Sequence, residues 1–192
     1  PQSPLLMVGD ISGHVKVFKL PTPDDNSQPQ QLQLPVPLFE LSHGHLDGQS
    51  IESCAFHPTG QFALSAAMDG RVLFYDSSTS YSIRCQFTLS EALAVENEDL
   101  SALLATEGVV LARWMASFAN GPALEPSLIF SVLIGSSCGR LCLVDGRTGR
   151  LLRKFKGRLG APILDASVSA GGILAVAFDD GSINEYQLQS KE

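Results

Sequence analysis

The stretch "AAMDGRVLFYD", residues 66–76, combines a run of small apolar residues, an Asp-Gly turn and an alternating run of large side chains. This order is typical of a β-hairpin, because Gly accepts the backbone conformation of a tight turn and alternation places every second side chain on one face. Three other stretches share the same pattern. The four turn segments are "SGHVKVF" (12–18), "DGRVLFY" (69–75), "CGRLCLV" (138–144) and "DGSINEY" (180–186). The chain is therefore predicted to repeat one hairpin unit.

The spacing of the units indicates how they are arranged. Their turn glycines, Gly13, Gly70, Gly139 and Gly181, are 57, 69 and 42 residues apart. The last spacing fits the period of about 40–45 residues of a four-stranded propeller blade. Two insertions account for the longer spacings. Residues 21–37 are rich in Pro and Gln and predict a flexible loop, whereas the acidic residues 90–107 predict a short helix or ordered insertion.

Further strand candidates precede each later hairpin in pairs. They are "PLFELS" (37–42) and "IESCAFH" (51–57), "SIRCQFTL" (82–89) and "VVLARWMASF" (109–118), and "GRLLRKFKG" (149–157) and "PILDASVS" (162–169). Grouping each pair with the hairpin that follows predicts an all-β fold. We expect residues 1–192 to form one β-propeller segment of four-stranded antiparallel blades, about three full blades plus a leading hairpin. Because blades bury their faces only by stacking, missing blades should come from the same chain or from a partner.

One unit carries a family resemblance. In residues 44–76, Gly44-His45 opens the unit, "AFHPTG" (55–60) forms an early turn, and "DGRVLFYD" (69–76) closes it. This unit resembles a WD repeat, with Tyr75 where the family usually has Trp. The resemblance implies a hydrogen-bonded structural network, made by His45, Ser65, Asp69 and Tyr75, that ties an outer loop to the blade.

Charge is unevenly distributed along the chain. The net charge is −7, with four Lys/Arg against 13 Asp/Glu in residues 1–110 and nine against seven in residues 111–192. One segment of twelve residues holds six cations, and we predict that it binds a partner: Arg147, Arg150, Arg153, Lys154, Lys156 and Arg158. An acidic protein surface is the expected partner, since Phe155 is the only aromatic residue there for base stacking. RNA stays an alternative, as does a purely solubilising edge strand.

No catalytic, metal or cofactor site emerges from the sequence. The "HGH" of residues 43–45 has no third ligand at a usual spacing, and nucleophile-elbow and phosphate-loop motifs are absent. The stretch "LVDGRTGRLLRKF" (143–155) also resembles quinoprotein-like propeller repeats. A quinoprotein-like enzyme or cofactor binder is therefore the alternative, although the repeated Trp of those blades is missing and the single Trp114 is expected in the core.

The sequence thus favours a non-catalytic propeller scaffold that mediates protein–protein interactions within a larger multi-subunit assembly. No apolar stretch reaches the roughly 18 residues of a membrane helix, and no signal peptide is evident, so no membrane partner is expected. The four cysteines, Cys54, Cys85, Cys138 and Cys142, are interpreted as reduced thiols. We expect an intracellular location, cytoplasmic or nuclear.

Overall fold

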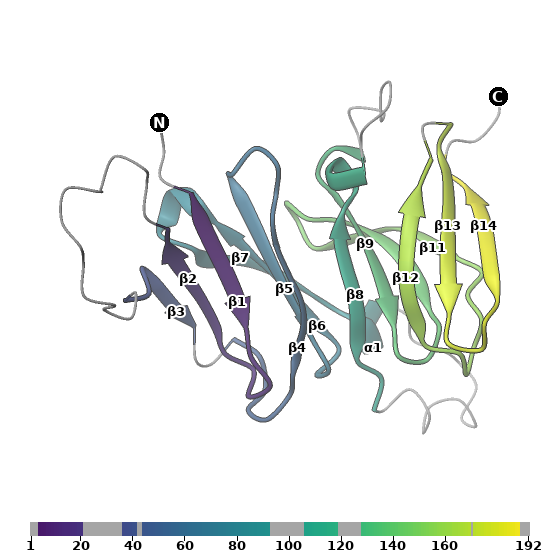
Figure 1. Ribbon diagram of the computed structural model, residues 1–192, viewed down its shortest axis with the longest axis horizontal. Coiled ribbons are helices and arrows are strands. Elements are labelled where there is room, and N and C mark those ends of the chain that lie inside the picture. Colours follow the sequence, from purple (N-terminus) through teal and green to yellow (C-terminus); the bar gives the residue numbers. More distant parts are fainter. Residues whose placement is uncertain are drawn as a thin grey trace, which may run out of the picture.

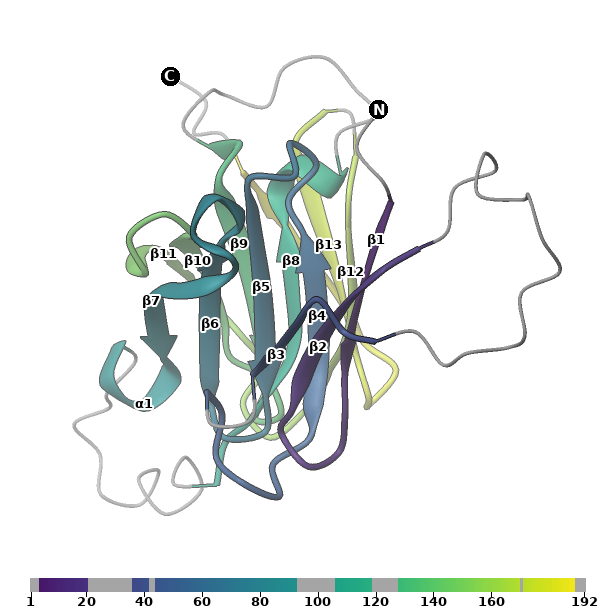
Figure 2. The same ribbon diagram turned by 90° about the vertical axis from the view of Figure 1, so that its left-hand side faces the viewer.

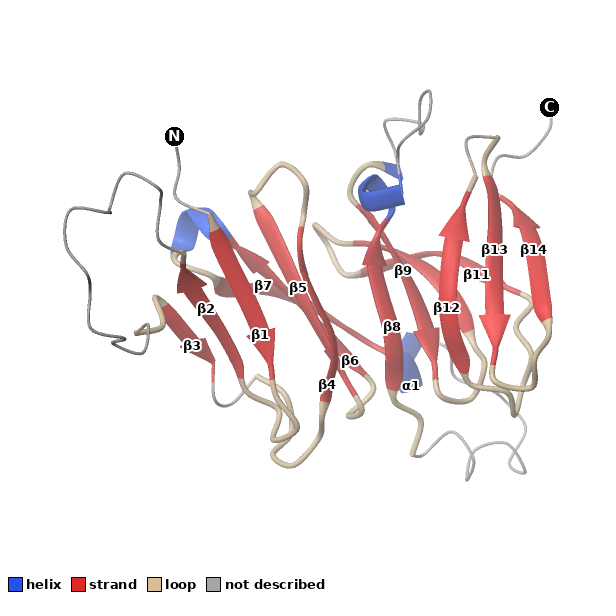
Figure 3. Cartoon of the chain, viewed as in Figure 1, coloured by secondary structure: helices blue, strands red, loops and turns tan. Residues whose placement is uncertain are grey.

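The computed structural model describes residues 4–20, 36–41, 44–92, 106–118, 128–169 and 171–188. Within these ranges, fourteen strands form four antiparallel sheets that stand side by side in chain order (Figure 1). The described residues also include the short helix α1 (Leu89–Ala92) and the 3-10 turns η2 (Ser77–Thr79) and η3 (Met115–Phe118) (Figure 3). The predicted all-β architecture of antiparallel blades is confirmed.

The two middle sheets each have four strands, and the outer two have three. The first sheet consists of β1 (Leu5–Gly9), β2 (Val15–Lys19) and β3 (Phe39–Leu41). The second consists of β4 (Ile51–Phe56), β5 (Phe62–Ala67), β6 (Arg71–Asp76) and β7 (Ser82–Thr88). The third consists of β8 (Val109–Trp114), β9 (Ser131–Ser136), β10 (Leu141–Asp145) and β11 (Arg150–Phe155). The last consists of β12 (Ile163–Val168), β13 (Ile173–Phe178) and β14 (Ile183–Gln187).

The grouping of strands differs from the sequence prediction in one respect. Strand β3, within the predicted "PLFELS" strand, pairs with β2, with Val15 opposite Leu41, and so joins the leading hairpin rather than the second unit. Each later strand of this kind does the same: β7 pairs with β6, and β11 pairs with β10. The first strand of each predicted pair therefore closes the sheet before it, and the second opens the next sheet.

Burial follows from the stacking. Strands β5, β6, β9 and β10 are almost continuously buried, since both faces of the middle sheets meet a neighbour. The last sheet is less buried: β12 and β13 include both buried and exposed residues, and every residue of β14 is exposed or half-buried, because only one face of the sheet is covered by a described neighbour. Three apolar clusters fill the three junctions between successive sheets. Figure 2, viewed from the first sheet, shows the sheets lying behind one another as a stack.

The predicted hairpin turns form as expected. Gly13, Gly70, Gly139 and Gly181 all have positive φ, between 75° and 89°, a region that favours glycine. These turns lie together at one end of the sheets, drawn at the bottom of Figure 1, which we call the hairpin end. Strands β4, β8 and β12 are neighbours along the inner side of the stack, so β7 and β11 are outer strands.

Both predicted insertions fall largely outside the described residues. These are residues 21–35 of the Pro/Gln-rich segment and residues 93–105 of the acidic one. The helix α1 lies at the start of the acidic segment. Among the described helices, none is long and apolar enough to cross a membrane.

Candidate interaction surface

At the hairpin end, the structure brings together the four side chains predicted to form a network. His45 Nδ1 lies 3.1 Å from an Asp69 carboxylate oxygen, and His45 Nε2 lies 2.7 Å from Ser65 Oγ. Ser65 Oγ in turn lies 2.6 Å from the Tyr75 hydroxyl. The side chains of His45 and Asp69 are fully buried. A buried network of this kind fixes the loop of residues 44–50 to the β5–β6 turn and offers no surface to a substrate.

The direction of each hydrogen bond in this network follows from Asp69. Burial alone would raise the pKa of this carboxyl, but bonds from the His45 side chain and from the backbone N–H groups of Leu46 and Arg71 hold its pKa below the ordinary value. The carboxylate only accepts, so His45 donates from Nδ1; in the tautomer that carries its single ring proton there, Nε2 accepts. Ser65 therefore donates to His45, and Tyr75 donates to Ser65. Burial raises the pKa of the Tyr75 phenol, which keeps this donor protonated.

The third sheet replaces this network with a buried ion pair that the sequence analysis missed. Cys138 stands at the turn position equivalent to Asp69, and the Arg140 guanidinium pairs through two nitrogens with the Glu107 carboxylate, with Nε 2.9 Å from Oε1. Both residues are less than 10% exposed. The sequence signals were an acidic residue two positions before β8 and an Arg directly after the turn glycine.

The structure does not gather the six predicted basic residues into one patch. Arg147 pairs with Asp145, and Arg158 pairs with Asp180. Arg153 donates to the carbonyl oxygens of Gln187 and Leu188, at 3.1 Å each, and so holds the end of β14. The other three, Arg150, Lys154 and Lys156, are exposed and form no ion pair with any residue that the structure describes.

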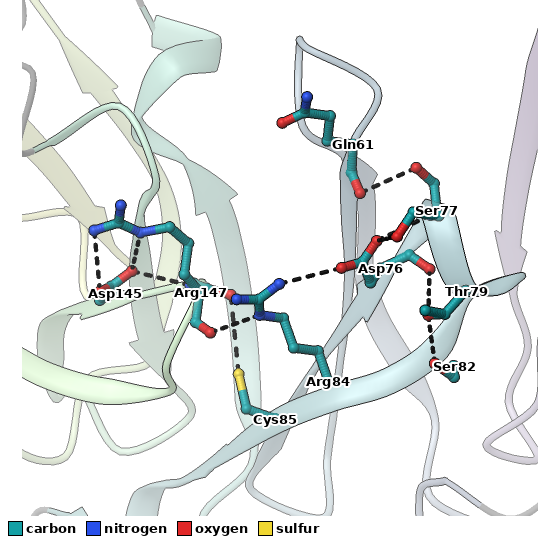
Figure 4. Close-up of polar contacts among 11 residues, drawn as sticks. Gln61, Asp76, Ser77, Thr79, Ser82, Arg84, Cys85, Asp145 and Arg147 are labelled. Atoms are coloured by element: carbon teal, nitrogen blue, oxygen red, sulfur yellow. Dashed lines mark hydrogen bonds and ion pairs between the residues drawn. The ribbon is translucent and has the colours of Figure 1, made fainter.

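Arg84 of β7, which lies outside the predicted basic segment, adds another positive charge where the second and third sheets meet (Figure 4). Its Nη1 lies 3.1 Å from Asp76, and its Nε donates to the Arg147 carbonyl oxygen at 2.9 Å. The sequence analysis did not single out Arg84, because it stands alone among neutral residues. Its connection to Arg147 arises only when β7 and the β10–β11 turn are packed together.

Each of these arginines lies over an aromatic ring. The Arg84 guanidinium is 5.3 Å from the centroid of Phe62, and that of Arg147 is 5.1 Å from the centroid of Phe130. The two rings contact each other edge to face, with centroids 5.6 Å apart. Stacking on a ring and pairing with a carboxylate fix the guanidinium of an exposed arginine. We call Phe62, Arg84, Phe130 and Arg147 the arginine–phenylalanine surface.

The outer strands extend this positive surface. Strands β7 and β11 contain Arg84, Arg150, Arg153 and Lys154 and no Asp or Glu, although the chain as a whole is acidic. Lys156 and Arg158, just beyond β11, line a groove of about 780 Å³ with Ile183–Tyr186 of β14. Basic residues therefore lie on both outer strands and on the segment that follows β11.

The aromatic and histidine side chains that could bind a quinone or a metal ion are instead held in packing contacts. Trp114 is fully buried and donates to the Ala55 carbonyl oxygen, so neither ring face is open to a stacked quinone. Phe74 and Phe178 are buried, and Phe62 and Phe130 are half-buried. His57 donates to the Ile129 carbonyl oxygen and is stacked on Phe130. Within the described ranges, no three His, Cys, Asp or Glu side chains are placed to hold a metal ion.

Comparisons with known proteins agree with this architecture. Residues 36–76 match the family "WD domain, G-beta repeat". A crystal structure of Sqt1 from Chaetomium thermophilum, bound to the N-terminus of the ribosomal protein L10, is similar with 21% identity and a TM-score of 0.70 over 95% of this chain and 40% of that chain. The C-terminal WD40 domain of Sif2 gives 19% identity and a TM-score of 0.57 over 96% and 40%, respectively.

A computationally designed protein, Ika4, is also similar, with 16% identity and a TM-score of 0.58 over 96% of this chain and 86% of that chain. The present chain thus spans about two fifths of the length of the Sqt1 and Sif2 chains. No curated protein sequence matches it. At these identities the structural likeness establishes the fold.

Proposed function

Because the chain contains a WD repeat at residues 36–76 and has the fold of WD-repeat propellers, we propose that it is a non-catalytic scaffold that binds other proteins. The proposed setting is a multi-subunit assembly in the cytoplasm or nucleus, where further blades come from the same chain or from a partner. The Sqt1 structure, which holds a segment of a ribosomal protein, supports protein binding by a propeller of this fold.

The observation that carries the proposal is the composition of the outer strands. Strands β7 and β11 expose arginines and lysines without a single acidic residue, on a chain whose net charge is −7. The basic residues of β7 and β11 form what we call the positive stripe of this otherwise acidic protein. The stripe attracts an acidic partner and repels a basic one, so it provides both affinity and selectivity. An acidic protein surface is therefore the proposed partner.

The arginine–phenylalanine surface is prepared for such contacts. Asp76 accepts from Arg84, and Asp145 accepts from Arg147, each on one side of the guanidinium. Nη2 of Arg84 and Nη1 of Arg147 therefore form no hydrogen bond with a described residue. An arginine already fixed by a ring and a carboxylate loses little side-chain entropy when it binds a second carboxylate. Rigid display of pre-oriented cations is the proposed mechanism.

The test uses Arg150 and Lys154 of β11, which form no ion pair with a described residue and, unlike Arg153, do not bond to the end of β14. We expect the variant Arg150→Glu/Lys154→Glu to lose capture of acidic proteins from nuclease-treated cell extract, with its thermal unfolding unchanged. Arg153 is left intact because it supports β14. Lys19→Glu, an exposed strand lysine on the first sheet, is the matched control for Lys154→Glu.

Two outcomes would count against the proposal. If capture by the double variant equals that of the unaltered protein, the outer strands are not the binding surface. If all capture disappears on nuclease treatment and depends steeply on salt, the stripe binds RNA and the protein-scaffold proposal is replaced.

A further inference from the structure

The turn between β6 and β7 presents a run of hydroxyl groups beside the arginine–phenylalanine surface. Residues 77–82 read Ser-Ser-Thr-Ser-Tyr-Ser, and η2 contains the first three of them. The exposed members are Ser78, Thr79, Ser80 and Ser82. The turn belongs to the second sheet, which has four described strands and a described sheet on either side (Figure 1). Its exposure therefore does not come from a missing neighbour.

The turn is anchored at one residue and open at the others. Ser80 and Tyr81 have φ values of 55° and 61°, in the left-handed region that non-glycine residues rarely adopt. The Tyr81 ring supports this geometry, because it packs against Phe39 and Phe56 with centroids 5.8 Å and 6.0 Å apart. In contrast, η2 contains no buried residue. A segment of this kind opens locally at small cost, which gives a modifying enzyme access to its hydroxyls.

The Ser78 hydroxyl is connected to Arg84 through a single carboxylate. Ser78 Oγ donates to Asp76 Oδ1 at 2.6 Å, and Asp76 Oδ2 accepts from Arg84 Nη1 at 3.1 Å. Figure 4 shows this arrangement, with Arg84 on one side of Asp76 and the turn on the other. A larger anionic group on Ser78 would extend past Asp76 toward the guanidinium.

The neighbouring hydroxyls are bonded elsewhere. Ser77 donates to a carbonyl oxygen of the β4–β5 turn, and Thr79 donates to the carbonyl oxygen at the end of β6, both at 3.1 Å. The Ser82 hydroxyl is bonded to that of Thr79. Among the hydroxyls of the described turn, only that of Ser78 bonds to the carboxylate that holds Arg84.

A phosphate on Ser78 would change the charge of the surface. Arg84 and Arg147 are paired with Asp76 and Asp145, so these four side chains are neutral as a group. Their attraction for an anion comes from the open guanidinium nitrogens. A phosphoserine adds a charge of about −1.5 to −2 at pH 7 and makes the group anionic.

Arg84 supplies a donor for this phosphate. Its Nε donates to the Arg147 carbonyl oxygen and its Nη1 to Asp76, whereas its Nη2 forms no hydrogen bond with a described residue. Bonds between guanidinium and phosphate are charge-assisted and strong. The phosphate oxygens would therefore occupy Nη2, the nitrogen that the proposed function leaves open for the carboxylate of a partner.

We infer that Ser78 is a phosphorylation site, and that its phosphate closes the arginine–phenylalanine surface to acidic partners. A protein kinase transfers the γ-phosphoryl group of ATP to Ser78 Oγ: the new O–P bond forms, the bond from the γ-phosphorus to the bridging oxygen breaks, ADP leaves and the hydroxyl proton passes to a base of the kinase. The regulatory consequence rests on the proposed scaffold function, whereas the contact between phosphate and Arg84 does not.

Incubation of the unaltered protein with cell extract, ATP and phosphatase inhibitors tests the modification. Trypsin releases residues 72–84 as one peptide, whose fragment ions locate the phosphate in a mass spectrometer. We expect phosphate on Ser78, and none on this peptide in Ser78→Ala. Ser90→Ala, at an exposed serine of α1, is the matched control and should keep it. An unmodified peptide, or phosphate on another of its hydroxyls, would overturn the inference.

Protein made with phosphoserine at position 78 tests the contact with Arg84. In phosphorus NMR titrations, Arg84→Gln should raise the pKa of this phosphate, because the guanidinium stabilises the dianion. The same change should leave the pKa of a phosphoserine at position 90 unaltered. If Arg84→Gln has no effect at position 78 either, the phosphate does not meet Arg84 and the inference is wrong.

Fluorescein-labelled octaglutamate, followed by fluorescence anisotropy at about 0.15 M salt, tests the consequence for binding. Phosphoserine at position 78 should weaken binding about tenfold, whereas phosphoserine at position 90 should change it little. Equal binding by the unaltered protein and the protein phosphorylated at position 78 would overturn the inference. If the unaltered protein itself does not bind octaglutamate, the proposed acidic partner is wrong and the regulatory consequence is lost with it, while the NMR result still decides whether the phosphate meets Arg84.

Discussion

The hydrogen-bond direction in the His45 network predicts an unusual order of mutant stabilities. Ser65 both donates to His45 and accepts from Tyr75, at 2.7 Å and 2.6 Å. Removing its hydroxyl in Ser65→Ala leaves two buried polar groups without a partner, the Nε2 of His45 and the Tyr75 hydroxyl. Tyr75→Phe leaves only one Ser65 lone pair unused, since Ser65 can still donate to His45. Although both substitutions delete a single hydroxyl, Ser65→Ala should therefore be the more damaging one.

The expected magnitudes follow from the cost of unsatisfied buried groups. At about 1–3 kcal/mol for each, Ser65→Ala should destabilise the fold by about 3 kcal/mol and Tyr75→Phe by about 1 kcal/mol. The double variant leaves only His45 Nε2 without a partner, so it should lose about 2 kcal/mol. Adding Tyr75→Phe to Ser65→Ala is thus expected to raise stability, which additive single effects could not produce.

Urea unfolding followed by the fluorescence of Trp114, the single tryptophan, measures these differences. Tyr81→Phe is the control: Tyr81 is half-buried and its hydroxyl has no hydrogen bond in the part of the chain that the structure describes, so less than about 0.5 kcal/mol should be lost. The reasoning is refuted if Tyr75→Phe is the more destabilising single change, or if the double variant is less stable than Ser65→Ala.

Two further predictions concern charged groups. The lowered pKa of Asp69 means that its carboxylate stabilises the fold fully above about pH 4 and loses this effect as the pH falls through the folded-state pKa. The stability gap between the unaltered protein and Asp69→Asn in urea titrations should therefore be constant at higher pH and narrow below about pH 4, and a gap that stays constant there would contradict it. Glu107→Ala should destabilise the fold by about 3–5 kcal/mol because Arg140 keeps its charge in a buried site. The double variant Glu107→Leu/Arg140→Met should recover most of this lost stability in the same urea assay. Equal losses of stability in the two variants would show that the unpaired charge is not the cause.

Much of the fold was predictable because its signals are local. A turn glycine followed by alternating apolar residues specifies a hairpin within about ten residues, and all four hairpins form where the sequence placed them. The network around Asp69 was predictable for a similar reason, because its four residues lie within one repeat unit. Their placement could be inferred from the family pattern before any coordinates were known.

The features that escaped prediction depend on contacts between sheets. Arg84 and Arg147 are 63 residues apart, and nothing in either sequence context indicates that one bonds to the other. The basic segment looked like one site because its residues are adjacent in sequence. In a strand, however, neighbours point to opposite faces, and Arg153 is directed to β14 while Lys154 is not. Sequence adjacency in an outer strand therefore overestimates how many charges one partner can meet.

One sequence repeat does not coincide with one sheet, and this offset connects each sheet to the next. The matched region of residues 36–76 begins with β3, which closes the first sheet, and continues with β4, β5 and β6 of the second. Each repeat thus spans two sheets, and His45 lies in the connection between them, where it is bonded to Asp69. Loss of this bond frees the connection at the point where one sheet is linked to the next.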